Sequence, residues 1–238
     1  MVIAHRATMG HAPENTLRGI RAGLDLGVDG IEIDVQLTAD GVPVLMHDRD
    51  LDRTTNGHGP LASHSWASVQ GLDAGKGETV PALAEVLDTV GRRATLMIEV
   101  KAAPGQHTAD VVTAITREVR ARDLTRQAWL WSFDAALLEA MSVIARDIPI
   151  AHLCQELTDD VLTRVSRLRL DGVSLHGSQV TGENLAILRE AQLDVFAWTV
   201  NEPAHLARLA ALGAGGHQLT GIVGDYPQRI TAALARVR

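Results

Sequence analysis

Short apolar runs and longer amphipathic segments alternate along the whole chain. The apolar runs with the length of β-strands cover residues 2–6, 30–35, 42–47, 94–100, 128–133, 148–154, 171–176, 194–200 and 221–225. Between most of them apolar residues recur with the period of a helix, and Gly27, Gly91 and Gly213 follow the last apolar position of three such segments. This alternation predicts βα units and a mostly parallel sheet.

The link between the second and third runs is the exception. It reads QLTADG, which is too short for a parallel crossover, whereas Asp40-Gly41 is a hairpin turn signal. We therefore expect strand 42–47 to return antiparallel. The remaining eight strands match the number that closes a (β/α)8 TIM-type barrel. An open α/β sheet would share this pattern, but no GxGxxG turn follows the first strand, which weakens the dinucleotide-binding alternative.

Composition narrows the class of protein. The 238 residues fit one barrel domain, 1–238, with an excursion at residues 52–79 over one end. The formal net charge is −7 and there is no run of basic residues, so we expect neither nucleic acid nor an anionic membrane surface as a partner. Cys154 is the single cysteine, and no export signal or membrane span is visible, so we expect a cytoplasmic protein without stable membrane insertion.

Two carboxylates interrupt the second apolar run, GIEIDV. Glu32 and Asp34 are two positions apart on a predicted strand, so both side chains lie on one face. An isolated buried carboxylate costs several kcal/mol, so this face needs a cation, hydrogen-bond donors or water. In a barrel, such a face opens at the carboxyl ends of the strands, where active sites form.

Other reactive residues are predicted at the same rim. His5 and Arg6 end the first strand, His47 ends the return strand, and Glu99 and Lys101 end the next one. Three oxygen ligands without cysteine favour a hard divalent cation, Mg²⁺ or Ca²⁺, held by Glu32, Asp34 and Glu99. Arg6 and Lys101 then remain as donors for a phosphate, and two histidines can serve as acid and base in phosphodiester cleavage.

Each of these residues also has a structural explanation. A strand-end carboxylate often caps a helix, a lone histidine is often a satisfied structural residue, and Lys101 could simply pair with Glu99, as Arg6 could with Asp34. The joint pattern weakens these explanations, because chance does not readily place all seven residues at the ends of neighbouring strands.

Several stretches resemble successive motifs of the glycerophosphodiester phosphodiesterase family. They are HRATMGHAPENT (5–16), GVDGIEIDVQLTADGVPVLMHDRDLDRTTNGHG (27–59), LDAG (72–75), VPALAEVL (80–87), IEVK (98–101), SFD (132–134), AWTVN (197–201) and GIVGDYP (221–227). The resemblance spans nearly the whole chain. It implies a (β/α)8 barrel that hydrolyses glycerophosphodiesters to an alcohol and glycerol 3-phosphate with a divalent cation.

The resemblance also implies roles for individual residues. His5 and His47 would be the general acid and base, and Glu32, Asp34 and Glu99 the metal ligands. Substrate would be bound by three residues, the phosphate by Arg6 and Lys101 and the glycerol side by Trp198. A strand-end tryptophan can also be a simple cover of the core.

The sequence departs from the family pattern in three places. Ala7 and Gly224 stand where Gly and Thr are usual, and the segment from Gly75 to Val80 is short. These differences bear on substrate identity more than on chemistry. Three alternatives stay open. One is a phospholipase D-type activity on lysophospholipids or another phosphodiester, and the second is a non-catalytic phosphometabolite-binding barrel. The least favoured is an aldolase-like barrel, because Lys101 would have to be neutral there although it lies next to Glu99.

Overall fold

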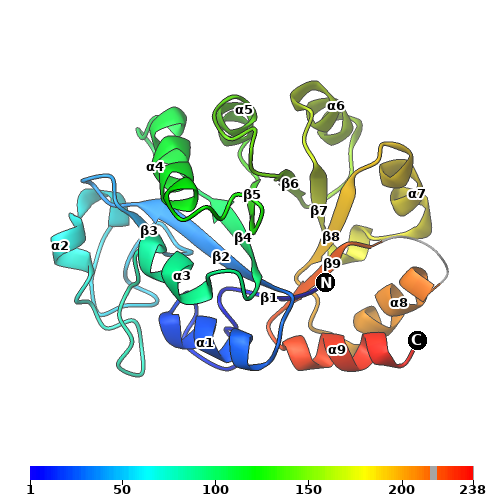
Figure 1. The fold of residues 1–238 in the computed structure, drawn as a ribbon, viewed down its shortest axis with the longest axis horizontal. Coiled ribbons are helices and arrows are strands. Elements are labelled where there is room, and N and C mark those ends of the chain that lie inside the picture. The colour runs from blue at the N-terminus through cyan, green and yellow to red at the C-terminus, as the bar shows by residue number, and fades with distance from the viewer. Residues whose placement is uncertain (215–218, 238) are drawn as a thin grey trace.

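The computed structural model describes residues 1–214 and 219–237. Its centre is a closed sheet of parallel strands, with helices arranged around it (Figure 1). The parallel strands are β1 (Val2–Ala4), β2 (Gly30–Leu37), β4 (Thr95–Val100), β5 (Ala128–Ser132), β6 (Ile150–Cys154), β7 (Gly172–His176), β8 (Asp194–Trp198) and β9 (Gly221–Gly224). Strand β1 pairs with both β2 and β9, which closes the barrel and excludes the open sheet.

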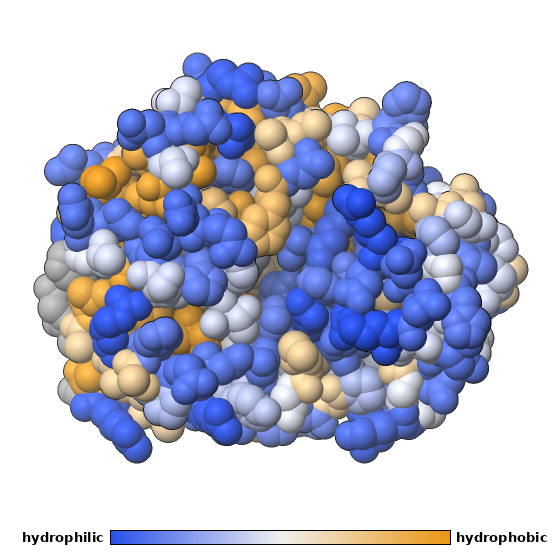
Figure 2. All heavy atoms as spheres, turned by 180° about the vertical axis from the view of Figure 1, so that it is seen from behind, coloured by the Kyte–Doolittle hydropathy of each residue, from blue (hydrophilic) through white to orange (hydrophobic). Residues whose placement is uncertain are grey.

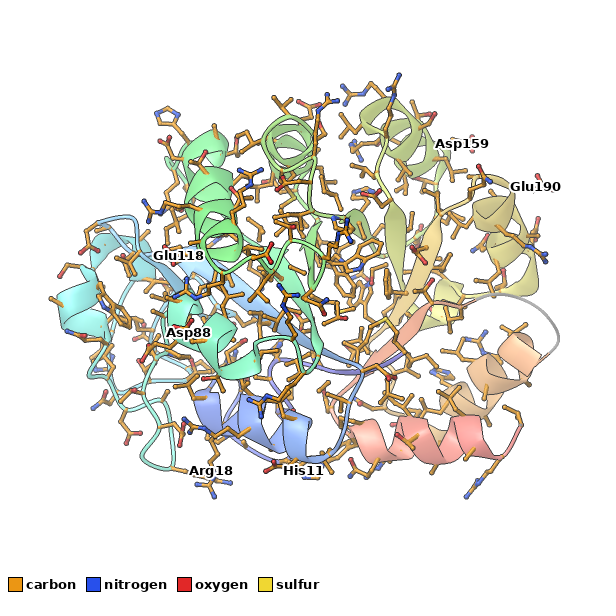
Figure 3. All side chains as sticks on the ribbon, viewed as in Figure 1. His11, Arg18, Asp88, Glu118, Asp159 and Glu190 are labelled. Carbon is orange, nitrogen blue, oxygen red and sulfur yellow. The ribbon has the colours of Figure 1, made fainter. Side chains whose placement is uncertain are left out.

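The outer layer consists of helices that follow the strands along the chain. They are α1 (Leu17–Asp25), α3 (Leu83–Val90), α4 (Thr108–Ala121), α5 (Ala135–Ile144), α6 (Asp159–Leu168), α7 (Gly182–Glu190), α8 (Pro203–Ala214) and α9 (Pro227–Ala235). Charged side chains such as Asp159 and Glu190 point away from the barrel (Figure 3). Within the part of the chain described, no helix combines the length and apolar character that crossing a bilayer requires.

Two of the three glycines predicted to follow a helix do so in the structure. Gly27 lies just beyond α1 with φ of 68°, and Gly91 caps α3 with φ of 54°, both in the left-handed region that glycine adopts at low cost. The expectation for Gly213 is wrong, because α8 continues through it to Ala214.

Strand β3 (Pro43–Leu45) is the predicted return strand. It pairs antiparallel with the end of β2, with Val35 opposite Leu45 and Leu37 opposite Pro43. Gly41 in the turn has φ of 78°, and Asp40 accepts hydrogen bonds from the hydroxyl of Thr38 at 2.6 Å and the backbone N–H of Trp66 at 2.8 Å. The hairpin prediction is therefore confirmed.

The excursion at residues 52–79 contains two short helical segments, η1 (Leu61–Ser63) and α2 (Trp66–Val69), which its sequence pattern did not reveal. A third short segment, η2 (Gly177–Gln179), follows β7. The excursion packs on a small core of its own, formed by Val44, Met46, Leu51, Leu61, Val69, Ala74 and Val80. Because these apolar residues come from separate turns, no single period connects them in the sequence.

The side chains of β2 alternate between its two faces, which explains where its two carboxylates lie. Ile31, Ile33 and Val35 face the helical layer and belong to the main core. The intervening Glu32 and Asp34 face the barrel interior, which is filled elsewhere by Ile3, Met97, Trp131, Ala151, Leu153, Phe196 and Val223. Most of the described interior residues are therefore apolar, and the acidic residues lie toward the carboxyl ends of β2 and β4.

Candidate active site

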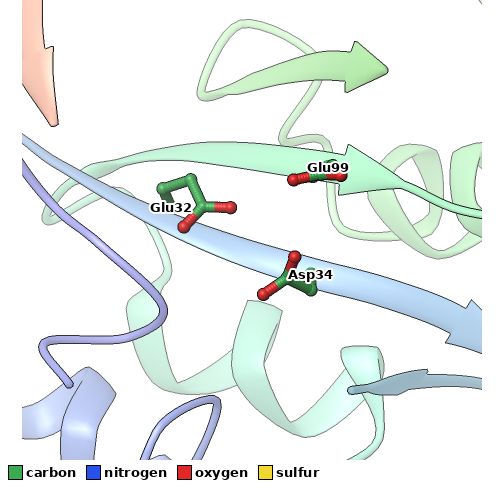
Figure 4. Close-up of side chains that lie close together, drawn as sticks. All are labelled: Glu32, Asp34 and Glu99. Carbon is green, nitrogen blue, oxygen red and sulfur yellow. The ribbon is translucent and has the colours of Figure 1, made fainter. Parts of the chain in front are cut away.

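Three carboxylates from two neighbouring strands form one cluster. Asp34 of β2 is in register with Glu99 of β4, and Glu32 lies two positions earlier on the same face. One oxygen from each residue lies within 4.8 Å of the others, and the three side chains gather on one side of the two strands (Figure 4). The sequence prediction brought these residues together on the basis of strand ends alone.

The three carboxylates lie close enough to repel one another. Burial, reinforced by the charges of Asp34 and Glu99, raises the pKa of Glu32 well above its ordinary value. Burial likewise raises the pKa of Glu99 to about 7, against the lowering effect of Lys101. Burial and mutual repulsion both disfavour the charged forms of these carboxylates, and a divalent cation between them would relieve the repulsion. The residues present could therefore hold a divalent cation.

Asp34 is the carboxylate with the most partners. Lys101 Nζ lies 2.6 Å from Oδ1, and Asn15 Nδ2 donates to Oδ2 at 2.8 Å. Burial is the largest single influence and raises the pKa of Asp34. The charges of Lys101 and His47, together with hydrogen bonds from Lys101 and Asn15, outweigh burial and keep this pKa below its ordinary value. Each carboxylate oxygen has two lone pairs, so these contacts leave room for a metal ligand bond as well.

Arg6 and Lys101 approach the same carboxylates. Arg6 Nε is 3.8 Å from Asp34 Oδ2 and has no hydrogen-bond partner among the described residues, although it is buried. Lys101 is also 3.5 Å from Glu99 Oε1 and donates to the backbone carbonyl of His47 at 3.1 Å. The pairings expected from the structural explanation therefore exist, yet both cations still line the rim.

A left-handed turn after β1 places Arg6. Arg6, Ala7 and Thr8 have φ of 44°, 55° and 64°, a conformation that is costly for residues with a side chain. The turn is held because the backbone N–H of Arg6 donates to Glu32 Oε2 at 2.8 Å and that of Ala7 donates to the Glu32 carbonyl at 2.9 Å. The Ala7 methyl is fully buried in this turn.

Each candidate histidine is oriented by an aspartate. His5 Nδ1 lies 2.6 Å from Asp225 Oδ1, and His47 Nδ1 lies 2.7 Å from Asp48 Oδ1. Because a carboxylate only accepts, Nδ1 carries the proton in each neutral ring and Nε2 keeps its lone pair. His5 Nε2 then faces the acidic cluster, 4.0 Å from Glu32 Oε2.

A second layer of polar residues fixes this arrangement. Asn201 Nδ2 donates to Asp225 at 2.7 Å, and Gln36 Nε2 donates to the carbonyls of Met46 and Asp48 at 2.8 and 2.6 Å. Arg53 makes paired hydrogen bonds to Glu14 and Asp48. The hydrogen bond from Arg53 is the main reason that the pKa of Asp48 lies far below its ordinary value.

Sequence reasoning missed these supporting residues. Asp225 ends the last strand, so the strand-end rule that found Glu99 would also have found it. Glu14 and Asn15 lie in the PENT stretch beside the histidine motif, and Asp48 directly follows His47. Glu14 and Asn15 contact Arg53 and Asp34, which lie far from them in the sequence, and spacing alone does not reveal such contacts.

The residues surround a cavity of about 120 Å³ at the carboxyl ends of the strands. Its polar lining consists mainly of His5, Arg6, Glu32, His47 and Glu99, and its apolar lining includes Trp131, Phe133, Leu153 and Trp198. Trp198 is oriented by a 2.9 Å hydrogen bond from its Nε1 to the Ser174 carbonyl and by edge contacts with Phe133 and His176. The face opposite Figure 1 is hollowed near its centre, with mostly hydrophilic residues on one side of the hollow (Figure 2).

The comparison with known proteins agrees with this geometry. Residues 5–228 match the Glycerophosphoryl diester phosphodiesterase family. The chain is 30% identical to a glycerophosphodiester phosphodiesterase of Caldanaerobacter subterraneus subsp. tengcongensis, over 97% of this chain and 96% of that protein. A glycerophosphodiester phosphodiesterase of Bacillus subtilis is 29% identical over 95% of this chain and 84% of its own length.

A solved structure shares the fold over nearly its whole length. It is a phosphodiesterase of Oleispira antarctica in complex with the product sn-glycerol-3-phosphate, with a TM-score of 0.88 and 28% identity, covering 98% of this chain and 96% of that one. The barrel and its rim of acidic, basic and histidine residues, together with these relatives, define a phosphoric diester hydrolase. The chain belongs to the glycerophosphoryl diester phosphodiesterase family.

Proposed function

We propose that the protein hydrolyses glycerophosphodiesters to an alcohol and glycerol 3-phosphate. One observation carries the proposal: two oriented histidines, an arginine and two carboxylates line one cavity together with aromatic side chains. The third carboxylate, Asp34, and its partner Lys101 lie directly beside them. The substrate is then a small molecule, and its glycerol carbons would pack on Trp198 while Arg6 and Lys101 bind the phosphate.

Glu32, Asp34 and Glu99 are the residues that would hold a divalent cation, Mg²⁺ or Ca²⁺. Such a cation, when bound, supplies Lewis-acid stabilisation of the negative charge on phosphate oxygens. Arg6 and Lys101 would add to that stabilisation from the rim, where Lys101 also donates to the His47 carbonyl.

The two histidines would move the protons. His5 Nε2, with its lone pair free because Asp225 holds Nδ1–H, takes a proton from the attacking hydroxyl, which belongs either to water or to the substrate itself. Protonated His47 gives a proton to the departing alkoxide. His47 suits this step because its burial lowers its pKa, which makes the imidazolium a stronger acid.

Hydrolysis of glycerophosphocholine, glycerophosphoethanolamine and glycerophosphoserine tests the proposal. We expect turnover that is lost in excess EDTA and restored by Mg²⁺ or Ca²⁺, and a loss of about 10²-fold or more in His47→Ala. His205→Ala, an exposed histidine on α8, is the matched control. Full activity in EDTA or in His47→Ala would show that the proposal is wrong, whereas cleavage of lysophospholipids alone would favour the phospholipase D-type alternative.

Two further expectations stay predictions. We propose that residues 1–238 act as one domain, which limited proteolysis would test by the absence of a stable fragment. We also propose that the protein is cytoplasmic, on the basis of its single cysteine, and cell fractionation would test this proposal.

A further inference from the structure

A second cavity of about 200 Å³ lies beside the first. It is lined by the carboxyl ends of β4 and β5 and by the segments that follow β3, β4 and β5, together with Gln36 and Leu137. His47, Glu99 and Phe133 line both cavities, so the two meet where the phosphate is proposed to bind. His5 and the tryptophans line only the first cavity, whereas Lys101, Arg49 and Asp134 line only the second.

A phosphodiester carries two ester arms on one phosphorus. With the phosphate at the shared boundary, the two arms must extend in different directions. The first cavity offers the aromatic wall proposed for glycerol, so the second cavity is the space available to the other alcohol. His47 borders both cavities and therefore lies beside the ester oxygen that leaves with this alcohol.

Most polar groups of the second cavity already have partners. Lys101 pairs with Asp34 and Glu99, and Gln36 Nε2 donates to backbone carbonyls. Asp134 caps α5, because its Oδ1 accepts from the backbone N–H groups of Ala136 and Leu137 at 2.7 and 3.3 Å. Lys101 is already assigned to the phosphate, and Gln36 and Asp134 are poorly placed to add new contacts to the alcohol.

Arg49 is the exception. Its side chain is exposed on the cavity and makes no ion pair or hydrogen bond with any residue in the described part of the chain. Its neighbours Asp48 and Arg53 are bound to each other, so Asp48 is not available to it. A guanidinium with five unused donors at the mouth of a cavity matches a planar carboxylate better than a quaternary ammonium.

We propose that the second cavity is the subsite for the departing alcohol, and that Arg49 selects alcohols that carry a carboxylate, such as serine. This inference rests on the proposed hydrolysis of glycerophosphodiesters. It names Arg49 as a specificity-determining residue: the guanidinium binds the carboxylate of the alcohol and repels a cationic head group such as choline.

Serine and ethanolamine esters form the decisive pair of substrates, because they differ only by the carboxylate. We expect wild-type kcat/KM to be about tenfold higher for glycerophosphoserine than for glycerophosphoethanolamine. Arg49→Gln should bring that ratio close to one, Arg49→Glu should bring it below one, and Arg49→Lys should retain part of the preference. Inhibition by phosphoserine and phosphoethanolamine should follow the same order, which gives a binding readout independent of turnover.

Arg146→Gln is the control, because Arg146 is an exposed arginine that lines neither cavity and the variant has the same change in net charge. Its substrate ratio should equal that of the wild type. Equal hydrolysis of both esters by the wild type, or a serine preference that Arg49→Gln leaves unchanged, would overturn the subsite alone. Failure to hydrolyse any glycerophosphodiester would overturn the proposed function and the subsite with it.

Discussion

Glu32 shows how one residue can serve both the fold and the chemistry. Its carboxylate accepts the Arg6 backbone N–H, and its own backbone carbonyl accepts that of Ala7, so it holds the left-handed turn that presents Arg6 and His5. The same carboxylate belongs to the acidic cluster. The strain of three consecutive left-handed residues is thus balanced by contacts to a residue of the site itself.

Asp225 is the residue on which the orientation of His5 depends. Asp225→Asn replaces the acceptor for His5 Nδ1–H by a group of the same shape that can present its amide to the ring instead. We expect kcat to fall by about 10²-fold with a smaller change in KM, because His5 would lose the tautomer in which Nε2 is free. Steady-state kinetics on a glycerophosphodiester measures this effect.

Asp25→Asn, at the exposed end of α1, is the matched control and should behave as the wild type. Circular dichroism of both variants would show that the fold is retained. An Asp225→Asn enzyme with an unchanged kcat would mean that the 2.6 Å contact with His5 has no part in proton transfer.

At the scale of elements, the β2–β3 hairpin carries most of the site. It supplies two carboxylates from β2 and, beyond β3, His47 and its partner Asp48. Gln36, buried in β2, donates to carbonyls on both sides of His47 and so fixes the position of this segment. The register of the hairpin therefore determines how far His47 lies from the acidic cluster.

Replacing Gly41 tests the turn of this hairpin. Gly41 has φ of 78°, and a Cβ there would meet no atom within 4 Å, so Gly41→Ala adds backbone strain without a clash. We expect the free energy of unfolding to fall by about 1 kcal/mol. Gly71→Ala is the control, because its surroundings are equally open and its φ lies outside the left-handed region.

Chemical denaturation of both variants measures the difference. If Gly41→Ala and Gly71→Ala lose the same amount of stability, the strained turn contributes nothing specific to the hairpin. Activity of Gly41→Ala on a glycerophosphodiester should stay close to that of the wild type, since the turn lies at the end of the hairpin remote from His47.

The sequence was informative at this scale because strand alternation and turn chemistry are local. Glu32 and Asp34 are two positions apart on a strand, which predicts that both side chains lie on the same face. Asp40-Gly41 predicted the hairpin that brings His47 back to the site. The second cavity and the pairing of Arg53 with Glu14 and Asp48 could not be predicted, because they depend on loops that meet only in the folded chain. The strand ends were also predicted too long, since the chain turns sharply at Arg6.

For the whole molecule, the acidic cluster makes the free energy of unfolding depend on whether a divalent cation is bound. Without a cation, Glu32 and Glu99 repel each other inside the barrel, so a cation that binds only the folded state stabilises it. We expect Mg²⁺ or Ca²⁺ at about 100 times its Kd to add about 2.7 kcal/mol, seen as a higher midpoint of thermal unfolding. Glu32→Gln should abolish most of this shift.

The variant should also be no less stable than the wild type in EDTA, because it removes one of the repelling charges. Glu190→Gln, on the outer face of α7, should keep the full metal-induced shift (Figure 3). An equal shift in Glu32→Gln and the wild type would place the stabilising cation elsewhere on the protein.

His152 predicts how the stability of the whole molecule depends on pH. It lies on β6 among outward-facing residues, is 3% exposed, and its Nδ1 has no partner in the described part of the chain. Burial, helped by the positive charge of Arg164 and opposed by Asp160, lowers its pKa to about 4. The unfolded chain, with an ordinary histidine pKa near 6.5, therefore binds more protons than the folded chain between these two values.

Stability due to neutral His152 is thus fully present above pH 6.5 and is lost as the pH falls toward 4. Between pH 7.5 and pH 5 the loss from this residue alone is about 2 kcal/mol. His152→Gln cannot take up the proton, so its free energy of unfolding should fall by about 2 kcal/mol less than that of the wild type over this interval. Denaturation curves in EDTA at both pH values measure the difference, and parallel pH profiles would mean that His152 is solvated enough to titrate in the folded protein.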